Sequence, residues 1–519
     1  MPRDLVIGID SSTTATKAIA WDRTGAPVAE GRAAIPLSQP RPRHFEQDPD
    51  DWWRSTSVAL TEITAKVEPA RIAGVAISNQ RETFGIFGEH GEPIRPAIVW
   101  LDERAMDQMR RFGASFGAKK IHAISGKPVD ITPCVYRMVW LRENEPHLLD
   151  RAAYVSEVHG YLCFRLTGRW ATSTASADPL GVLDMERLAW SQDILAAAGV
   201  RIEKMLPLER PGALIGTVTD AAARATGVLP DTPVFAAGGD GQCAGTGVEV
   251  MRAGRAYINL GTAVVAGSYA ERYVFDAAFR TETAVADGGY IVETCLRSGT
   301  FLIDWMEREL LNIDPQRRLE ALTALEAEAA ASPVGANGVM LVPYWEGCMT
   351  PHWDAAARGV IAGLSGSTRR GDLYRALLEG VVLEQALASR RLQAGSGQQI
   401  DHYVAVGGGT ASDLWMQILA DATGVPIHRS TSKEASSLGA AMAAATGCGW
   451  FRSIAEASAA MAGPLVRSFQ PRPKEKKEYA ELGEIYAELW PAVSSWNRKL
   501  ARFVEQRATP ANAKASEEK

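Results

Sequence analysis

Hydrophobic and polar positions follow two periods along this chain, and together they predict strands that are followed by helices. Runs of β-branched and aromatic residues between turn residues predict β-strands. These strands are expected at 5–9, 17–21, 28–35, 255–260 and 263–269. Apolar residues at helical spacing predict helices over 50–63, 372–392 and 412–423. Strands followed by helices imply layered α/β domains.

The pattern near the N-terminus returns in the middle of the chain. In both places small hydroxyl or glycine residues directly follow a buried strand, which suggests that the same strand-and-loop motif occurs twice. Two phosphate-binding loops would then face one cleft. At 519 residues the chain is too long for one ordinary core. We expect an N-terminal domain over 1–251 and a C-terminal domain over 252–508. The remaining segment, 509–519, has nothing to bury and is expected to be disordered.

Composition and charge limit the classes of molecule that this chain is expected to bind. Hydrophobic residues make up 46% of the chain and charged residues 22%, the balance of a soluble globular protein. A net charge of −6 argues against binding nucleic acid or an anionic membrane surface, and favours a small-molecule partner. We find no signal peptide and no long apolar segment, so a cytoplasmic location is expected. The six scattered cysteines predict reduced, mostly buried thiols.

The first candidate site follows the first strand, where a carboxylate, a run of hydroxyl residues and a cation come in succession. Backbone N–H groups and hydroxyls can donate to phosphate oxygens, the lysine can offset their charge, and the aspartate can hold Mg²⁺ through water. An ordinary side-chain-capped turn is the alternative, and the second loop at Gly261-Thr262 favours nucleotide binding. No Gly-x-x-x-x-Gly-Lys-Ser/Thr occurs, which disfavours a P-loop fold. The residues concerned are Asp10, Ser12, Thr13, Thr14 and Lys17.

Two further glycine-rich segments each carry a carboxylate. Residues 404–413 predict a strand, a triple glycine and the start of a helix that is capped by Ser412 or Asp413. A phosphate or an adenosine could approach the backbone at these glycines and at the helix N-terminus. Taken alone, this segment is more often a glycine turn without a ligand. In the loop 237–242, Asp240 could be the base that accepts a hydroxyl proton during phosphoryl transfer. A lone Asp-Gly turn would be the simpler reading of it.

The motifs occur together and in order, and the chain thereby resembles the FGGY carbohydrate kinases from Ile7 to about Trp450. Residues 341–347, Leu-Val-Pro-Tyr-Trp-Glu-Gly, resemble the motif of the second domain in that family. The segments at 359–364, Gly-Val-Ile-Ala-Gly-Leu, and 372–379 follow its signature. The resemblance implies two ribonuclease-H-like domains of the actin/hexokinase ATPase type, with Mg²⁺ and ATP in the cleft between them. It also implies a homodimer or a homotetramer.

The resemblance assigns roles to individual residues. Asp240 would be the catalytic base, and Asp10 with Asp240 would hold Mg²⁺. ATP would contact Ser12, Thr13, Thr14, Lys17, Gly261, Thr262, Gly408, Gly409 and Asp413. The acceptor would contact Arg81, Glu82, Trp100, Asp102, Thr132, Asp240 and Gly241.

The acceptor is read from residues 78–83 and 100–104, which resemble the version found in glycerol kinases. An Arg81-Glu82 pair can grip adjacent hydroxyls, and Trp100 can pack against the carbon chain. The alternative is a surface salt bridge between Arg81 and Glu82.

Three residues are smaller than their glycerol-kinase counterparts: Thr132, Gly241 and Val265. The lost bulk suggests a longer linear substrate. The main prediction is therefore phosphorylation of erythritol in carbohydrate metabolism. The alternatives are a pentulose kinase acting on D-xylulose or a related ketose, a glycerol kinase, and a non-catalytic nucleotide-binding relative.

Overall fold

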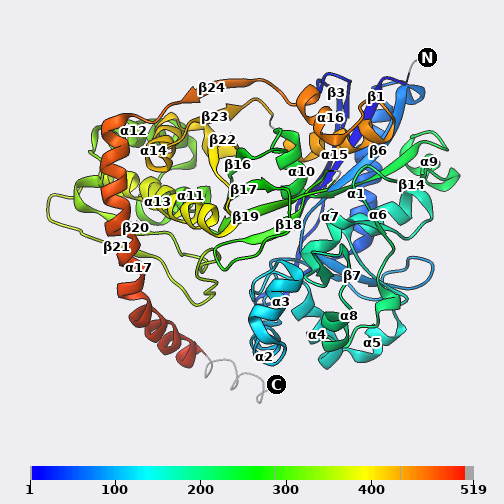
Figure 1. Cartoon of the computed structure of the whole chain (residues 1–519), viewed down its shortest axis with the longest axis horizontal. Helices are drawn as coiled ribbons and strands as arrows, with labels where there is room; N and C mark the ends of the chain where they lie inside the picture. Colours follow the sequence, from blue (N-terminus) through cyan, green and yellow to red (C-terminus); the bar gives the residue numbers. More distant parts are fainter. Residues whose placement is uncertain (1–2, 287, 433, 509–519) are drawn as a thin grey trace.

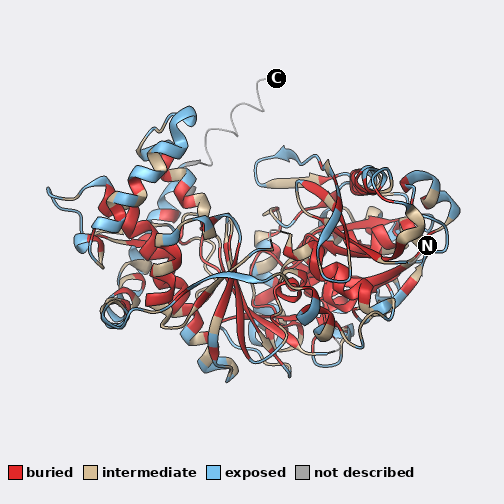
Figure 2. Cartoon of the chain, turned by 90° about the horizontal axis from the view of Figure 1, so that it is seen from above, coloured by how far each residue is buried: buried red, intermediate tan, exposed pale blue. Residues whose placement is uncertain are grey.

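The computed structural model describes residues 3–286, 288–432 and 434–508 (Figure 1). The segment 509–519, predicted to be disordered, lies outside the described residues. Two large sheets, each covered by helices, form the two halves of the chain. Buried residues concentrate in the strands and in the helix faces turned toward them (Figure 2).

The N-terminal sheet has six strands in the order β14-β15-β6-β1-β2-β3. They are β1 (Leu5–Ser11), β2 (Ala15–Trp21), β3 (Pro27–Ala34), β6 (Ile72–Asn79), β14 (Leu214–Thr217) and β15 (Pro233–Gly239). Strands β1, β6 and β15 are parallel, so their carboxyl ends meet at one edge. Helix α1 (Pro49–Thr64) covers one face and buries Trp52 and Leu60.

The C-terminal sheet has seven strands in the order β18-β19-β17-β16-β22-β23-β24. They are β16 (Gly254–Leu260), β17 (Val264–Ala270), β18 (Arg280–Thr283), β19 (Tyr290–Leu296), β22 (Ile400–Val406), β23 (Ile427–Ser430) and β24 (Leu465–Phe469). The parallel pair β16 and β22 brings two strand ends to the same edge. The predicted strands and helices are confirmed, including α13 (Arg370–Ser396) and α14 (Asp413–Thr423).

Helices from both halves lie between the two sheets. Helix α10 (Asp240–Gly247) packs against α15 (Ala435–Gly447), and α15 in turn covers β1 and β6. The Ser437 hydroxyl donates to the Gly8 carbonyl oxygen at 2.8 Å, and a Cβ on Gly8 would lie 1.9 Å from the Ser437 carbonyl oxygen. A segment beyond the predicted domain boundary therefore belongs to the packing of the N-terminal sheet.

Much of the chain between β3 and β14, other than α1 and β6, builds a smaller unit on the N-terminal half. Its five-stranded sheet comprises β4 (Ser38–Arg41), β5 (His44–Gln47), β7 (Phe84–Phe87), β8 (Ala97–Ile98) and β9 (Tyr154–Glu157). Its helices include α2 (Met106–Phe112), α3 (Ala118–Ser125), α4 (Val135–Asn144) and α5 (Pro146–Arg151), whereas α6 (Val158–Thr167) buries its apolar side in the core of the main N-terminal sheet. Segment 78–83 runs from the end of β6 into this unit, and segment 100–104 follows β8.

Two further findings bear on the predictions. All six cysteines are free, and five of them are buried, while Cys448 is half-buried, which confirms the predicted thiols. Among the described residues, no helix is both long and apolar enough to span a bilayer.

On the outer side of the C-terminal half lie α12 (Arg318–Ala331) and the last helix, α17 (Pro473–Ala508).

Candidate active site

Asp10 and Asp240 meet at the carboxyl edge of the N-terminal sheet. Asp10 lies near the end of β1, and Asp240 begins α10 directly after β15. The prediction of a loop at Asp240 was therefore wrong, because the glycines preceding it belong to the strand and those following it belong to the helix. Burial and the nearby Asp240 carboxylate raise the pKa of Asp10 to about 7. Burial also raises the pKa of Asp240, although Arg81 opposes this effect.

This pair of carboxylates fits a hydrated Mg²⁺ ion. Mg²⁺ is commonly bound through one or two carboxylates together with water and phosphate oxygens. The described residues contain no cluster of three metal-ligating side chains, so phosphate oxygens and water would have to complete the shell. A cation between Asp10 and Asp240 would offset the repulsion that raises the pKa of Asp10.

The first predicted phosphate loop is held by its own turn and by the smaller unit. Ser12 donates from both its backbone nitrogen and its hydroxyl to the Ala15 carbonyl oxygen, at 3.0 and 2.8 Å. The indole nitrogen of Trp100 donates to the Thr13 hydroxyl at 2.8 Å. Trp100, predicted to bind the acceptor, therefore also contacts the phosphate loop. Thr14 is exposed on this turn.

Lys17 faces carboxylates from two parts of the chain. Its ammonium group lies 2.5 Å from Glu434 and 3.7 Å from Glu30, and its register partner across the β1–β2 pair is Asp10. Glu434 immediately precedes α15. The lysine thus joins the first loop to the C-terminal half, and the charge that it could offer to phosphate is shared with Glu434.

The second and third predicted ATP loops lie side by side at the edge of the C-terminal sheet. Gly261 and Thr262 form the turn between β16 and β17, and their carbonyl oxygens accept from the backbone nitrogens of Thr300 and Gly299. Gly409 follows β22, and a Cβ on it would lie 2.9 Å from the Leu260 Cβ. Gly408 has open space where a Cβ would be. The backbone at Gly408 is therefore accessible to a flat ligand.

Helix α14 begins as predicted but uses only one of its two candidate caps. The Ser412 hydroxyl accepts from the Trp415 backbone nitrogen at 3.0 Å. Asp413 instead pairs with Arg429 at 2.7 Å and with Arg467, and these hydrogen bonds lower its pKa. An adenosine near this helix would meet an Asp413 carboxylate that already has two cationic partners.

Arg81 and Glu82 lie in a buried network of charges that spans both halves. Arg81 Nε lies 3.1 Å from Asp240, and Arg81 Nη1 lies 3.1 Å from Glu293 on β19. Glu82 accepts from Arg280 on β18 at 2.7 Å. Arg81 and Glu82 are only 9% and 8% exposed, so the surface salt-bridge alternative is wrong.

Sequence reasoning did not identify the partners of Arg81 and Glu82 in the C-terminal half. Arg280 also contacts Glu293 at 2.7 Å, and Lys127 reaches Glu282 at 3.0 Å. Charged residues are rare inside strands that are buried on both faces. The alternation Arg280-Thr-Glu282 in such a strand was the signal that could have revealed them.

Three other predicted acceptor residues have different surroundings. Asp102 is fully buried, and its carboxylate accepts from Arg104 and from the Phe45 backbone nitrogen, so it is not free to bind a substrate. Thr132 is 6% exposed and donates to Asp130 at 2.8 Å. A Cβ on Gly241 would lie 2.9 Å from the Arg81 guanidinium. The space beside Gly241 is therefore filled by Arg81 and is not an enlarged substrate pocket.

Known family models and relatives match this chain along most of its length. Residues 5–247 match the N-terminal domain and residues 256–448 the C-terminal domain of the FGGY family of carbohydrate kinases. A xylulose kinase of Bacillus subtilis is 29% identical over 503 residues, covering 96% of this chain and 99% of that protein. A glycerol kinase of Citrifermentans bemidjiense is 30% identical, covering 92% and 97%.

Solved structures are similar over nearly the same length. The crystal structure of xylulose kinase from Rhodospirillum rubrum has a TM-score of 0.89 and 25% identity, covering 95% of this chain and 99% of that one. Plasmodium falciparum glycerol kinase with ADP has a TM-score of 0.84 and 23% identity, covering 93% and 98%. The predicted fold, two α/β domains of the actin/hexokinase type, is confirmed.

Proposed function

The chain belongs to the FGGY family of carbohydrate kinases, and we propose that it transfers a phosphoryl group from ATP to a neutral pentulose, D-xylulose or a related ketose. The family establishes an ATP-dependent kinase of a small carbohydrate. The identity of the acceptor is the proposed part. Xylulose kinases among the relatives match the chain over almost its whole length.

The pentulose alternative is better supported than the expectation of erythritol. That expectation relied on lost bulk around the acceptor, and Arg81 occupies the space beside Gly241. Thr132 is likewise held by Asp130 and buried. The pair Arg81 and Glu82 offers donors and acceptors to hydroxyls of a polyol or a ketose alike. Erythritol and glycerol therefore belong in the test as second acceptors.

The charge around Arg81 favours a neutral acceptor. Four carboxylates lie within ion-pairing distance of the two guanidinium groups of Arg81 and Arg280, namely those of Glu82, Asp240, Glu282 and Glu293. A sugar acid would add another negative charge to a buried site in which carboxylates already outnumber cations. Hydroxyl and carbonyl groups bring no such penalty. We therefore expect ketoses and polyols to be phosphorylated in preference to aldonic acids.

We propose Asp240 as the base. The acceptor hydroxyl would give its proton to the Asp240 carboxylate as the new O–P bond forms, the bond between the γ-phosphorus and the β,γ-bridging oxygen breaks, and ADP leaves. Mg²⁺, when bound, neutralises charge on the phosphate oxygens. Arg81 holds the Asp240 carboxylate at 3.1 Å and so fixes its direction. Burial raises the pKa of Asp240, which brings its basicity closer to that needed at neutral pH.

The contact between Arg81 and Asp240, with Asp10 near the end of β1 at the same edge of the sheet, carries this proposal. The test is an ADP-release assay with D-xylulose, D-ribulose, erythritol, glycerol and D-gluconate, each at several concentrations. Turnover with a ketose at a kcat/KM well above that for erythritol, glycerol and gluconate supports the proposal. A higher kcat/KM for erythritol would restore the original expectation, and turnover limited to gluconate would contradict the charge argument.

A further inference from the structure

Strand β15 contains a β-bulge shortly before Asp240. The strand advances three positions from Phe235 to Gly238, while its neighbour β6 advances only two, from Ala76 to Ser78. An extra residue of this kind bends a strand and changes the direction of the side chains that follow it, and bulges are common beside active sites. The direction in which Asp240 points therefore depends on how the bulge is held.

Ala237 lies in this bulge and is the last residue before Asp240 that has a side chain. Gly238 and Gly239 come between them, and a Cβ on Gly239 would lie 2.6 Å from Arg81 Cγ. Two glycines restrict the backbone less than any other pair of residues, so they do not fix the path of the chain by themselves. The backbone position of Ala237 therefore sets where Asp240 begins.

Two buried side chains contact the backbone of Ala237. The Ser173 hydroxyl donates to the Ala237 carbonyl oxygen, and the Ala237 N–H donates to His159 Nε2 at 3.4 Å. Both side chains are fully buried. The Ser173 oxygen also accepts from the Ala175 backbone nitrogen at 3.2 Å, so the direction of its own O–H is fixed.

A chain of hydrogen bonds sets the protonation of His159. Its Nδ1 lies 3.3 Å from the Thr172 hydroxyl, which donates to the Glu157 carboxylate. Since the Thr172 proton goes to Glu157, the Thr172 oxygen accepts from Nδ1–H, and Nε2 is left as an acceptor. Burial lowers the pKa of His159 to about 3, so the ring stays neutral. The imidazole is therefore held in the tautomer that can accept the Ala237 N–H.

The segment 173–178 also holds the chain on the other side of Asp240. The side-chain amide of Gln242 donates to the Ala175 carbonyl oxygen at 3.0 Å and to the Asp178 carboxylate at 3.1 Å. The segment thus contacts the backbone three positions before Asp240 and a side chain two positions after it. Both flanks of the proposed base are fixed to one short piece of the chain.

We propose that Ser173 and His159 are positioning residues for phosphoryl transfer, which fix the bulge at Ala237 and so direct the Asp240 carboxylate toward the acceptor hydroxyl. This inference rests on the proposed role of Asp240 as the base. Arg81 holds the carboxylate itself at 3.1 Å, whereas Ser173 and His159 hold the backbone from which it projects. Proton transfer requires hydrogen-bond distance, so a displaced base slows the chemical step. The loss should therefore appear in kcat and leave both KM values unchanged.

The experiment measures kcat and KM by ADP release, with the acceptor that gives the highest kcat/KM in the panel above. Ser173→Ala removes the donor to the Ala237 carbonyl oxygen, and His159→Leu removes the acceptor of its N–H. Each should lower kcat by about tenfold, with KM for ATP and for the acceptor within twofold of the wild type. His159→Gln offers an amide oxygen in place of Nε2 and should keep kcat within about threefold of the wild type.

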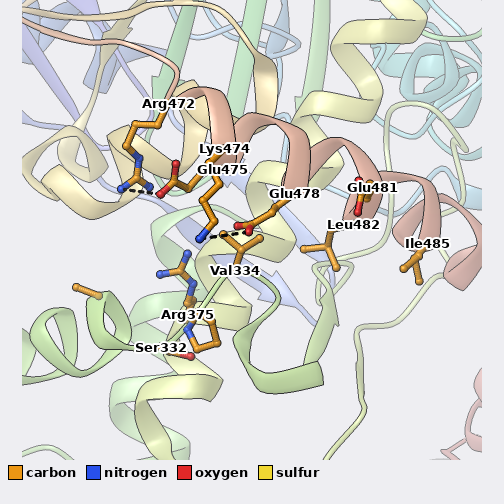
Figure 3. Close-up of a pocket in the computed structure, with 12 residues that line it drawn as sticks. Ser332, Val334, Arg375, Arg472, Lys474, Glu475, Glu478, Glu481, Leu482 and Ile485 are labelled. Carbon is orange, nitrogen blue, oxygen red and sulfur yellow. Dashed lines mark ion pairs between the residues drawn. The ribbon is translucent and has the colours of Figure 1, made fainter.

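Ser332→Ala is the matched control, because the Ser332 hydroxyl is also buried and donates to Asp372 at 2.7 Å. Ser332 lines a pocket of about 470 Å³ beside α17, on the outer side of the C-terminal half (Figure 3). This variant loses a hydrogen bond of the same kind far from β15, so its melting temperature should fall while its kcat stays within twofold of the wild type. Melting temperatures of all variants show that they are folded.

A kcat within twofold of the wild type for both Ser173→Ala and His159→Leu overturns the proposal. It is also overturned if the loss appears in KM alone, or if His159→Gln loses as much kcat as His159→Leu. Asp240→Asn separates this inference from the proposed function. If Asp240→Asn keeps the wild-type kcat, the base and its positioning residues both fall. If Asp240→Asn loses turnover while Ser173→Ala and His159→Leu do not, only the positioning role falls.

Discussion

Replacing Asp10 by asparagine should stabilise the protein while removing its activity. The folded chain holds this carboxyl at a pKa of about 7, compared with 3.8 for an ordinary aspartate, because it is buried and lies near Asp240. Keeping it ionised at pH 8 therefore costs the folded state about 4 kcal/mol at most. Asparagine carries no charge and can still accept from the Ser78 hydroxyl, which lies 3.2 Å from Asp10 Oδ1.

The net gain should be smaller than that limit, because the side-chain amide of asparagine is itself polar and also loses water on burial. We expect the free energy of unfolding at pH 8 to rise by about 2 kcal/mol, or about 4 °C in the melting temperature of a half of this size. The sign follows from linkage. Below pH 3.8 the carboxyl is protonated in both states, so the gain vanishes there, and it grows between pH 4 and pH 7 as only the unfolded chain ionises.

Scanning calorimetry of the wild type and Asp10→Asn at pH 5 and pH 8 measures this difference. Asp372→Asn is the matched control, because hydrogen bonds from Ser332 and from the Arg369 backbone lower the pKa of Asp372. That variant should be destabilised at both pH values. An Asp10→Asn variant less stable than the wild type, or a gain that does not grow with pH, would refute the placement of Asp10 as a carboxylate held ionised for binding Mg²⁺ and ATP.

Three further predictions concern turnover. Asp240→Asn should lower kcat by at least about a hundredfold, while the nucleotide affinity measured by calorimetry stays within a few-fold of the wild type. Lost nucleotide binding would give Asp240 a structural role. Arg280→Lys should raise the KM for the acceptor by about tenfold and leave the KM for ATP unchanged, because lysine cannot make two directed contacts to Glu82 and Glu293. The control is Arg375→Lys, which changes a buried arginine on α13. Equal effects from both variants would contradict a role of Arg280 at the acceptor. The Mg²⁺ concentration that gives a half-maximal rate should rise about tenfold for each pH unit below pH 7 and should be constant above pH 7, since Asp10 must lose its proton to hold the ion. A Mg²⁺ requirement that does not change with pH would count against Asp10 as a ligand.

The sequence predicted the local structure well because the periodic signals are strong where strands and helices are buried. The antiparallel strands β1, β2 and β3, the antiparallel pair β16 and β17, and the helices α1, α13 and α14 follow directly from the apolar spacing. The start of α10 was missed because glycines on both sides of Asp240 are typical of a turn. Only the packing of α10 against α15 makes a helix favourable there.

The long-range contacts of the site could not be predicted from local patterns. Lys17 and Glu434 are 417 positions apart, yet they form an ion pair because α15 packs on the N-terminal sheet. Arg81 and Glu293 are 212 positions apart and meet only through the pairing of the two halves. Gly241 was interpreted as lost bulk, because a single sequence does not show that the Arg81 guanidinium, from the loop after β6, fills the space.

Phosphoryl transfer to a ketose is tested most directly by the product balance of the reaction with D-xylulose and Mg²⁺-ATP, followed by phosphorus NMR. We expect one sugar phosphate to form for each ADP, with little ADP released when the ketose is left out and neither product formed by Asp240→Asn. ADP released at the same rate with and without any sugar or polyol, and with no phosphate ester in the products, would contradict it.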